Sequence, residues 1–184
     1  MQFPVPRVPQ SPAASRGAID ARLTVELSRL TVELASVVAG ARRRALRDGD
    51  RQIDTAHLLH SLLECAPAVG AAFDGPGRVA RVLGYLVQRS IGYGLRWQGA
   101  VEDSGVAPLV VRKNQMAGWS PSAVAAMARA LDRAAQREDA RAHGLDLLAA
   151  LVADPACRAV EVLGRAGADP AALTRRIAEL SQQV

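Results

Sequence analysis

The sequence predicts an all-α protein built from two related four-helix units, with a Pro-rich arm at its N-terminus. The first observation is composition: 49% of the 184 residues are hydrophobic but only 3% are aromatic, so leucine, valine and alanine must build the core. Alanine-rich cores favour closely packed helices over sheets. The second observation is the helical spacing of the apolar residues, with Ser, Asp and Pro where helices begin. The third is an internal duplication that relates the two halves of the chain.

The arm covers residues 1–17, which are rich in proline and polar residues, so we expect a flexible segment outside the folded domain. The domain spans 18–184, and its first helix is predicted over 18–48. In that stretch the motif RLTVEL occurs twice, and its period places apolar side chains along one face. A stripe that faces the core is the simplest interpretation. A short coiled-coil seam, or a strand over the first copy, remains an alternative.

Three further helices are predicted before the middle of the chain. Asp54 or Thr55 caps the first, which carries a run of leucines. Pro67 begins a short helix that is expected to end at Phe73. An Asp-Gly-Pro-Gly turn then leads to an amphipathic helix that ends near Arg89.

Glycines and prolines punctuate residues 90–118, which we interpret as a connector between two halves. Within it, 91–97 and 109–112 could pair as two short strands. The first repeat therefore covers about 28–89, and the second covers 119–184.

The second repeat begins with a strong helix-start signal. Ser120 stands at the N-cap position and Pro121 at the first helical position. Asp169 and Pro170 repeat this signal for the last helix, which is predicted to reach Val184. Two shorter helices are predicted between these signals.

A shift of about 89 positions lays Asp50–Leu63 over Asp139–Val152, and an aspartate and several leucines coincide. In each half a long helix precedes this segment and two helices follow it. One unit that occurs twice and buries a single continuous core explains the pattern.

In their order and spacing these motifs resemble the Clp N-terminal repeat domain at the front of ClpC-, ClpA- and ClpB-type unfoldases. The family's helix-start signature, I-G-T-E-H-I-L-L-G-L, is matched by Ile53–Leu62 and, more weakly, by Ala142–Leu151. An aromatic residue followed by Thr/Ser-Pro ends the family's connector, as 119–121 do here, and Val162–Leu173 matches the pattern of the last helices. The resemblance covers roughly 28–184. It implies a recognition domain that stands alone, without the ATPase motor.

The resemblance also implies a partner-binding surface. Relatives use an apolar patch beside the connector's aromatic residue for partner contacts, and some cyclic-peptide antibiotics bind there. The corresponding residues here are Leu27, Leu30, Trp119 and Val124. The implied ligands are proteins or peptides, namely a Clp unfoldase, its substrates or a cyclic-peptide antibiotic. A role for Trp119 as a packing residue that seals the two repeats is the alternative to its role as an interface anchor.

Some relatives bind phosphorylated arginine through the Glu of the signature in each repeat. Those positions are Ala56 and Leu145 in this chain. Apolar side chains cannot pair with a buried guanidinium group. We therefore expect phosphoarginine recognition to be lost or strongly weakened.

The motifs of common enzymes are absent from the sequence. The only lysine, Lys113, is followed by Asn114, so no P-loop G-x-x-x-x-G-K-[S/T] is present, and neither G-x-S-x-G nor H-E-x-x-H occurs. His57, His60 and Cys65 are close in sequence but make a poor set of metal ligands. We expect no catalytic residues, no cofactor and no metal. An enzyme of unknown type stays the third possibility for function.

The net charge of the chain suggests an alternative function. The net charge is +5, and a cluster at Arg42–Arg44 and Arg47 lies towards the end of the first helix, where it suits the helix dipole. A basic regulator that binds nucleic acid would show strongly salt-dependent binding. The sequence contains no apolar run of about 18 residues and no signal-peptide pattern. Together with two isolated cysteines, this predicts a reduced, cytoplasmic protein.

Overall fold

The computed structural model describes residues 28–90, 97, 100–105 and 118–182. These residues form eight helices and no strand, which confirms the predicted all-α class. The first half contains α2 (Val32–Arg47), α3 (Thr55–Cys65), α4 (Pro67–Gly70) and α5 (Pro76–Ser90). The second half contains α7 (Pro121–Gln136), α8 (Gly144–Val152), α9 (Arg158–Arg165) and α10 (Pro170–Ser181). Among the described residues, no helix combines the length and the apolar character that a membrane crossing requires.

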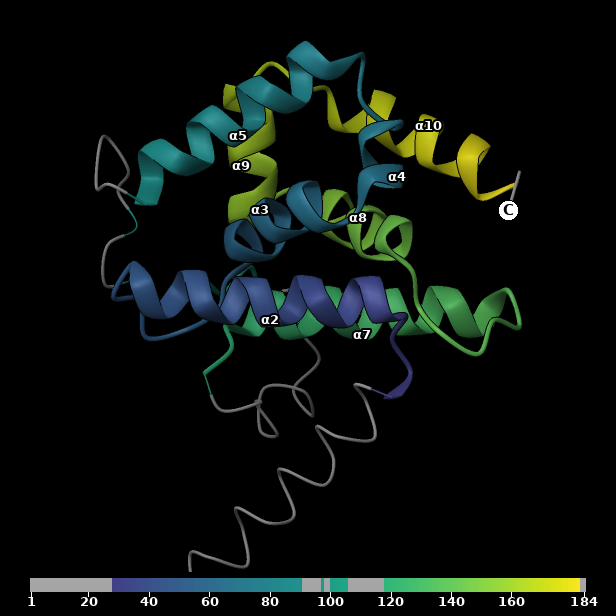
Figure 1. Cartoon of the computed structure of the whole chain (residues 1–184), viewed down its shortest axis with the longest axis horizontal. Coiled ribbons are helices and arrows are strands. Elements are labelled where there is room, and N and C mark those ends of the chain that lie inside the picture. The colour runs from purple at the N-terminus through teal and green to yellow at the C-terminus, as the bar shows by residue number, and fades with distance from the viewer. Residues whose placement is uncertain (1–27, 91–96, 98–99, 106–117, 183–184) are drawn as a thin grey trace, which may run out of the picture.

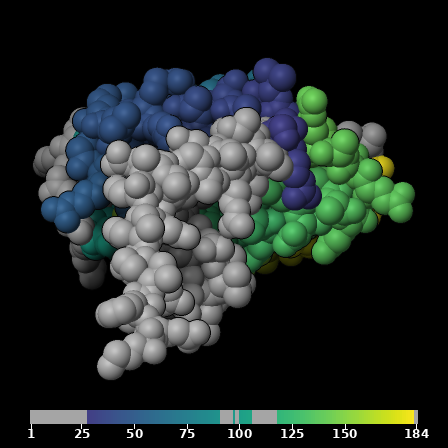
Figure 2. Space-filling model, turned by 90° about the horizontal axis from the view of Figure 1, so that it is seen from below, coloured from purple at the N-terminus to yellow at the C-terminus, as the bar shows by residue number. Residues whose placement is uncertain are grey.

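The helices form layers in which the two halves interleave. In Figure 1, α2 and α7 lie at the bottom, α3 and α8 lie in the middle, and α5, α9 and α10 lie above them. Figure 2 shows the molecule from below, from the side of α2 and α7. The middle helices carry the core, because α3 contacts α2, α8 and α9 while α8 contacts α7, α4 and α10. The packing of helices from both halves around α3 and α8 makes one continuous core, as the duplication predicted.

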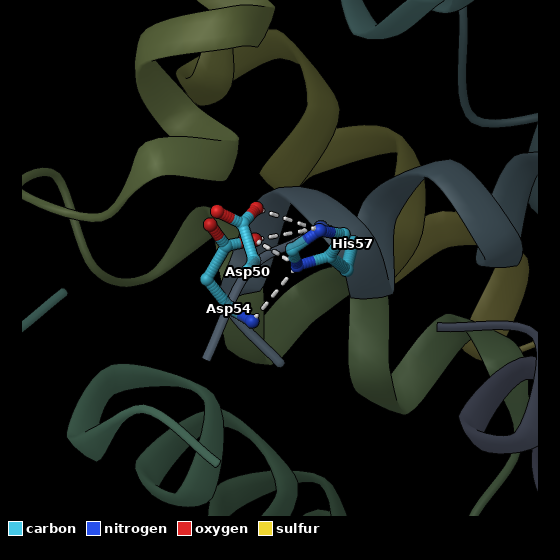
Figure 3. A group of neighbouring side chains, drawn as sticks. All are labelled: Asp50, Asp54 and His57. Carbon is cyan, nitrogen blue, oxygen red and sulfur yellow. Dashed lines mark hydrogen bonds and ion pairs between the residues drawn. The ribbon is translucent and has the colours of Figure 1, made fainter. Parts of the chain in front are cut away.

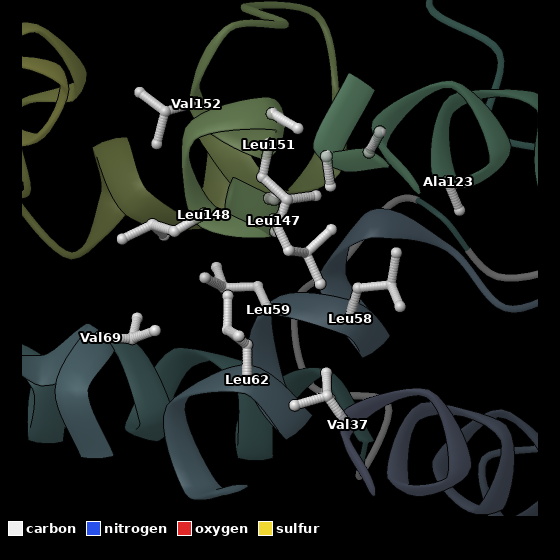
Figure 4. Packing of buried hydrophobic residues seen from close by; sticks show 14 of the residues in the cluster. Val37, Leu58, Leu59, Leu62, Val69, Ala123, Leu147, Leu148, Leu151 and Val152 are labelled. Atoms are coloured by element: carbon white, nitrogen blue, oxygen red, sulfur yellow. The ribbon is translucent and has the colours of Figure 1, made fainter. Parts of the chain in front are cut away.

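Leucines of α3 and α8 fill the centre of this core. Figure 4 shows the leucines of one helix pointing toward those of the other. Six of them have no exposed surface: Leu58, Leu59, Leu62, Leu147, Leu148 and Leu151. These are the residues that the duplicated segment aligned, so the sequence repeat reflects one packing solution used twice.

The predicted helix starts are confirmed by their caps. Ser120 Oγ accepts a hydrogen bond from the Ala123 N–H at 3.1 Å, and Pro121 begins α7. The Asp169 carboxylate accepts from Ala171 N–H at 3.0 Å, and Pro170 begins α10. A side chain at the N-cap satisfies backbone donors that have no partner inside the helix.

The first helix begins later than predicted. The helix expected over 18–48 is interrupted before Val32, because Thr31 caps α2 by accepting from the Leu34 N–H at 3.2 Å. Leu30 pairs its backbone with Ala142 in the other half and so leaves the helical path. Residues 1–27, which include the arm, the first RLTVEL copy and its alternative readings, lie outside the described residues.

Two other boundaries differ from the prediction. The last helix ends at Ser181 and not at Val184, and the short helix at Pro67 ends at Gly70 and not at Phe73. The chain continues in tight turns, in which the Phe73 N–H donates to the Gly70 carbonyl, and Gly75 then adopts a φ of 81°. The strand pair predicted in the connector lies outside the described residues except for Trp97.

A pair of backbone bridges joins the halves with near two-fold symmetry. Leu30 pairs with Ala142, and Ile53 pairs with Trp119. Under the shift of about 89 positions, Leu30 corresponds to Trp119 and Ile53 to Ala142, so each bridge is the counterpart of the other. The Ile53 bridge is held by two hydrogen bonds of 2.8 Å, one to Gly118 and one from Ser120.

Candidate functional site

Three of the four residues predicted to bind a partner lie in the core. Leu30 is 5% exposed, Trp119 3% and Val124 9%, and all three belong to one hydrophobic cluster. The fourth, Leu27, lies outside the described residues. The structure therefore brings three of the four into the same cluster, with almost none of their surface accessible. A ligand can reach Trp119 only by displacing the chain that covers it.

The two positions that carry a glutamate in phosphoarginine-binding relatives offer no charge. Ala56 is fully buried in the first turn of α3, and Leu145 packs half-buried against the core in the first turn of α8. Neither site provides a carboxylate for a guanidinium group.

A buried carboxylate that the motifs did not predict joins three helices. Glu102, which is 5% exposed, accepts hydrogen bonds at the starts of α3, α7 and α9. Its donors are the Thr55 N–H at 2.8 Å and the Thr55 hydroxyl, the Ser120 hydroxyl at 2.9 Å, and the Arg158 N–H at 2.8 Å. The helix dipoles place partial positive charge at these three N-termini, so a single carboxylate stabilises all of them.

Asp54 lies at the centre of an adjacent ion-pair network. Its carboxylate pairs with two arginines from different helices. Arg89 belongs to α5, and Nη1 of Arg158 in α9 lies 2.7 Å from Asp54 Oδ2. Burial by itself raises the pKa of Asp54, but hydrogen bonding with His57 and the charge of Arg89 hold that pKa below its usual range. The carboxylate therefore stays ionised and ties α3 to α5 and α9.

His57 completes this network and closes the cap of α3. The His57 N–H donates to Asp54 Oδ1 at 2.9 Å, and the Asp54 N–H donates to His57 Nδ1 at 3.1 Å. The second repeat uses the same positions with the residue types exchanged: the His143 N–H donates to Asp146 Oδ2 at 2.9 Å. Both helices thus begin with a reciprocal cap.

The cluster of Asp50, Asp54 and His57 has the donor types of a metal site, and one atom of each lies within 4.8 Å of the others (Figure 3). Arg89 already occupies the space between the carboxylates, with Nη2 3.0 Å from Asp50 Oδ2 and also bonded to Asp54. A guanidinium group at this position supplies the positive charge that a cation would bring. The geometry therefore indicates that the cluster of Asp50, Asp54 and His57 holds helices together.

Trp97 extends the network to the surface. Its ring centroid lies 5.5 Å from the Arg89 guanidinium carbon and 5.4 Å from that of Arg158, and its Nε1–H donates to Glu161 at 3.0 Å. Cation–π contacts of this kind orient both arginines for Asp54. Nothing in the sequence around Trp97 and Glu102 marks them as structural, because their partners are distant along the chain.

The cysteines lack the surroundings of a nucleophile. Burial raises the pKa of the Cys157 thiol to about 11, and the thiol donates to the Leu151 carbonyl at 3.4 Å. A thiol that stays protonated at neutral pH is a poor nucleophile. Cys65 is half-buried and free.

A shallow groove of about 310 Å³ lies at the C-terminal end of α2. Its sides come from α2, from the loop that leads to α3, and from Gly118 at the end of the connector. The guanidinium-bearing residues Arg42 and Arg51 line it. A groove of this volume has room for a peptide side chain.

Comparison with known proteins identifies the fold. No protein-family model matches the sequence, and no curated protein matches it either. Among solved structures, the N-terminal domain of the caseinolytic protease associated chaperone ClpD from Arabidopsis thaliana is similar, with a TM-score of 0.57, 18% sequence identity, and coverage of 85% of this chain and 96% of that chain. A chain from a study of a malarial protein secretion system gives a TM-score of 0.56 at 14% identity, and the match covers 82% of this chain and 93% of that chain. In fold, this protein is a Clp N-terminal-like domain.

Proposed function

We propose that this chain is a non-catalytic protein-binding domain that acts as an adaptor or decoy of a Clp unfoldase–protease system. The observation that carries the proposal is the fold, which is shared over most of its length with a domain of a chaperone associated with a caseinolytic protease. Two features of the chain agree with a binding role: the sequence contains no P-loop, and burial keeps the Cys157 thiol protonated.

The first test is a degradation assay. A ClpC-type unfoldase and its protease degrade a fluorescent substrate while increasing amounts of the purified chain are added. A decoy lowers the rate of degradation and an adaptor raises it for selected substrates. A rate that does not change at any concentration of the chain would contradict the proposal.

We further propose that the region of Leu27, Leu30, Trp119 and Val124 receives the partner, and that cyclic-peptide antibiotics directed at ClpC-type unfoldases are among its ligands. The three described residues are buried in the free chain, so binding must expose Trp119. Exposing Trp119 costs free energy. A ligand can offset this cost only if it binds the open state more tightly than the closed state.

Tryptophan emission separates this site from the rest of the chain. The protein has two tryptophans, so the variant Trp97→Phe leaves Trp119 as the reporter. Titration of this variant with a cyclic-peptide inhibitor of ClpC-type unfoldases is expected to shift the emission of Trp119. A phosphoarginine peptide is expected to leave it unchanged, because Ala56 and Leu145 lack the carboxylates. Calorimetry in parallel detects ligands that bind without moving Trp119.

A further inference from the structure

The groove at the end of α2 carries positive charge that the protein does not neutralise. Arg42 and Arg51 line the groove, and both are exposed. Within the described part of the chain, neither has a carboxylate partner, whereas Arg44 of α2 pairs with Glu64 of α3. Asp50, the one acid among the described residues that line the groove, is engaged by Arg89 at 3.0 Å. The groove therefore attracts a negatively charged ligand.

The floor of the groove is apolar. Ile53 and Ala45 are buried beneath it, and Leu46 stands at its edge with 74% of its surface exposed. At Gly118 an added Cβ would meet no atom within 4 Å, so the groove is open on that side. Gln52 also lines the groove, and its buried Oε1 has no hydrogen-bond partner among the described residues.

The two arginines of the groove are specific to the first repeat. Under the shift of about 89 positions, Arg42 corresponds to Leu131 and Arg51 to Ala140. The counterpart surface of the second repeat carries its positive charge at other positions, for example at Arg141. The duplicated fold therefore does not itself require cations at positions 42 and 51.

We propose that this groove binds an acidic peptide segment of a partner protein, with carboxylates at Arg42 and Arg51 and an apolar side chain against Leu46. The inference rests on the protein-binding function proposed above and adds the site and the chemistry of the partner. Arginine forms its best-oriented ion pairs with carboxylates, and exposed apolar surface beside it adds buried area. The lining residues that the structure describes include no aromatic side chain on which a nucleic-acid base could stack.

The experiment uses the full chain and the labelled peptide Glu-Leu-Glu-Glu-Leu-Glu, with the same peptide carrying Gln for Glu as the uncharged probe. Fluorescence anisotropy at low ionic strength measures binding to the protein and to the double variant Arg42→Glu/Arg51→Glu. The matched control is Arg141→Glu, an exposed arginine outside the groove for which the described residues offer no carboxylate partner. Circular dichroism melts show whether each variant is folded.

The acidic peptide is expected to bind the protein and the Arg141→Glu variant with affinities within about twofold of each other, and to bind the double variant at least about tenfold more weakly. Equal binding to the folded double variant, or no binding to the unchanged protein, would overturn the inference. A single-stranded oligonucleotide and the unlabelled peptide are each used to displace the labelled peptide. If the oligonucleotide displaces it at the lower concentration, the groove is a nucleic-acid site and the inference is overturned.

The degradation assay keeps the two proposals apart. If the chain alters Clp-dependent degradation while the peptide does not bind the groove, the groove inference fails and the proposed function stands. If the peptide binds through Arg42 and Arg51 while degradation never changes, the Clp function fails and the groove stands.

Discussion

Glu102 joins three helices through one side chain. Its carboxylate accepts hydrogen bonds from Thr55, Ser120 and Arg158, which stand at the starts of α3, α7 and α9. At each of these starts the backbone donors lack partners within the helix. A buried carboxylate that satisfies several donors at once contributes more than an exposed ion pair, because loss of the carboxylate leaves all of them unpaired in a medium of low polarity.

Replacement of Glu102 by Ala is expected to lower the free energy of unfolding by about 3 kcal/mol or more, since several buried donors lose their acceptor. Urea unfolding followed by circular dichroism measures the change. The control is Glu179→Ala on the exposed face of α10, which is expected to change stability by less than about 0.5 kcal/mol. Equal effects of the two substitutions would show that Glu102 does not hold the helix starts.

His60 gives the stability a dependence on pH. Burial, together with the charge of Arg44, lowers the pKa of His60 from 6.5 to about 4. The imidazole is neutral in the folded protein at pH values where the unfolded chain binds a proton. Because the unfolded state holds more protons in this window, stability decreases as the pH falls from about 6.5 to about 4.

The variant His60→Gln tests this assignment. Urea midpoints are measured between neutral pH and the lower end of that window. The variant is expected to lose less stability on acidification than the unchanged protein, because glutamine does not titrate. Gln182→Ala, which changes an exposed side chain that does not titrate, is the control and is expected to keep the original pH dependence. Parallel curves for the unchanged protein and His60→Gln would contradict the prediction.

At the scale of elements, the two long helices begin with counterpart caps that differ in their surroundings. Thr31 caps α2 and Ser120 caps α7, each by accepting the N–H three residues on. Only the Ser120 hydroxyl has a second role, as it donates to Glu102 at 2.9 Å. The same position of the repeat is therefore a simple cap in the first half and part of a buried network in the second.

The substitution Thr31→Ala is expected to cost about 1 kcal/mol of stability, the usual value for a lost N-cap. Ser120→Ala is expected to cost more, since it also leaves Glu102 without one donor. Chemical denaturation of both variants gives the comparison, with Thr174→Ala on the exposed side of α10 as a control. A larger effect at Thr31 than at Ser120 would contradict the role of the network.

At the scale of the molecule, the two halves share contacts across one core. The backbone bridges from Leu30 to Ala142 and from Ile53 to Trp119 cross between them, and Asp54 of the first half binds Arg158 of the second. The central leucines of α3 and α8 pack in one cluster. The duplication therefore builds one cooperative core with shared contacts.

The counterparts Leu59 and Leu148 test this cooperativity. Each is fully buried, so substitution by Ala is expected to cost about 2–5 kcal/mol. Tryptophan emission and far-ultraviolet circular dichroism are expected to report one coincident transition in both variants, because damage to either half weakens the whole core. Two separate transitions, with only one shifted by each variant, would show independent halves.

The sequence by itself determined the helical class, most helix starts and the duplication. Ser120-Pro121 and Asp169-Pro170 are local signals, since a cap and its backbone partner lie within three residues. Leucines at helical spacing likewise predict the buried face of α3 without knowledge of its neighbours. Such features depend on contacts between residues that are close along the chain, so a linear pattern records them.

Only the tertiary structure decided the rest. The start of α2 at Val32 depends on the pairing of Leu30 with Ala142 in the other half. Trp119, which is buried, pairs in the same way with Ile53. The network of Glu102 joins segments from the connector and both repeats, and no spacing in the sequence marks such a meeting point. Long-range contacts are fixed by how whole helices pack, and that packing is a property of the folded chain and not of any local motif.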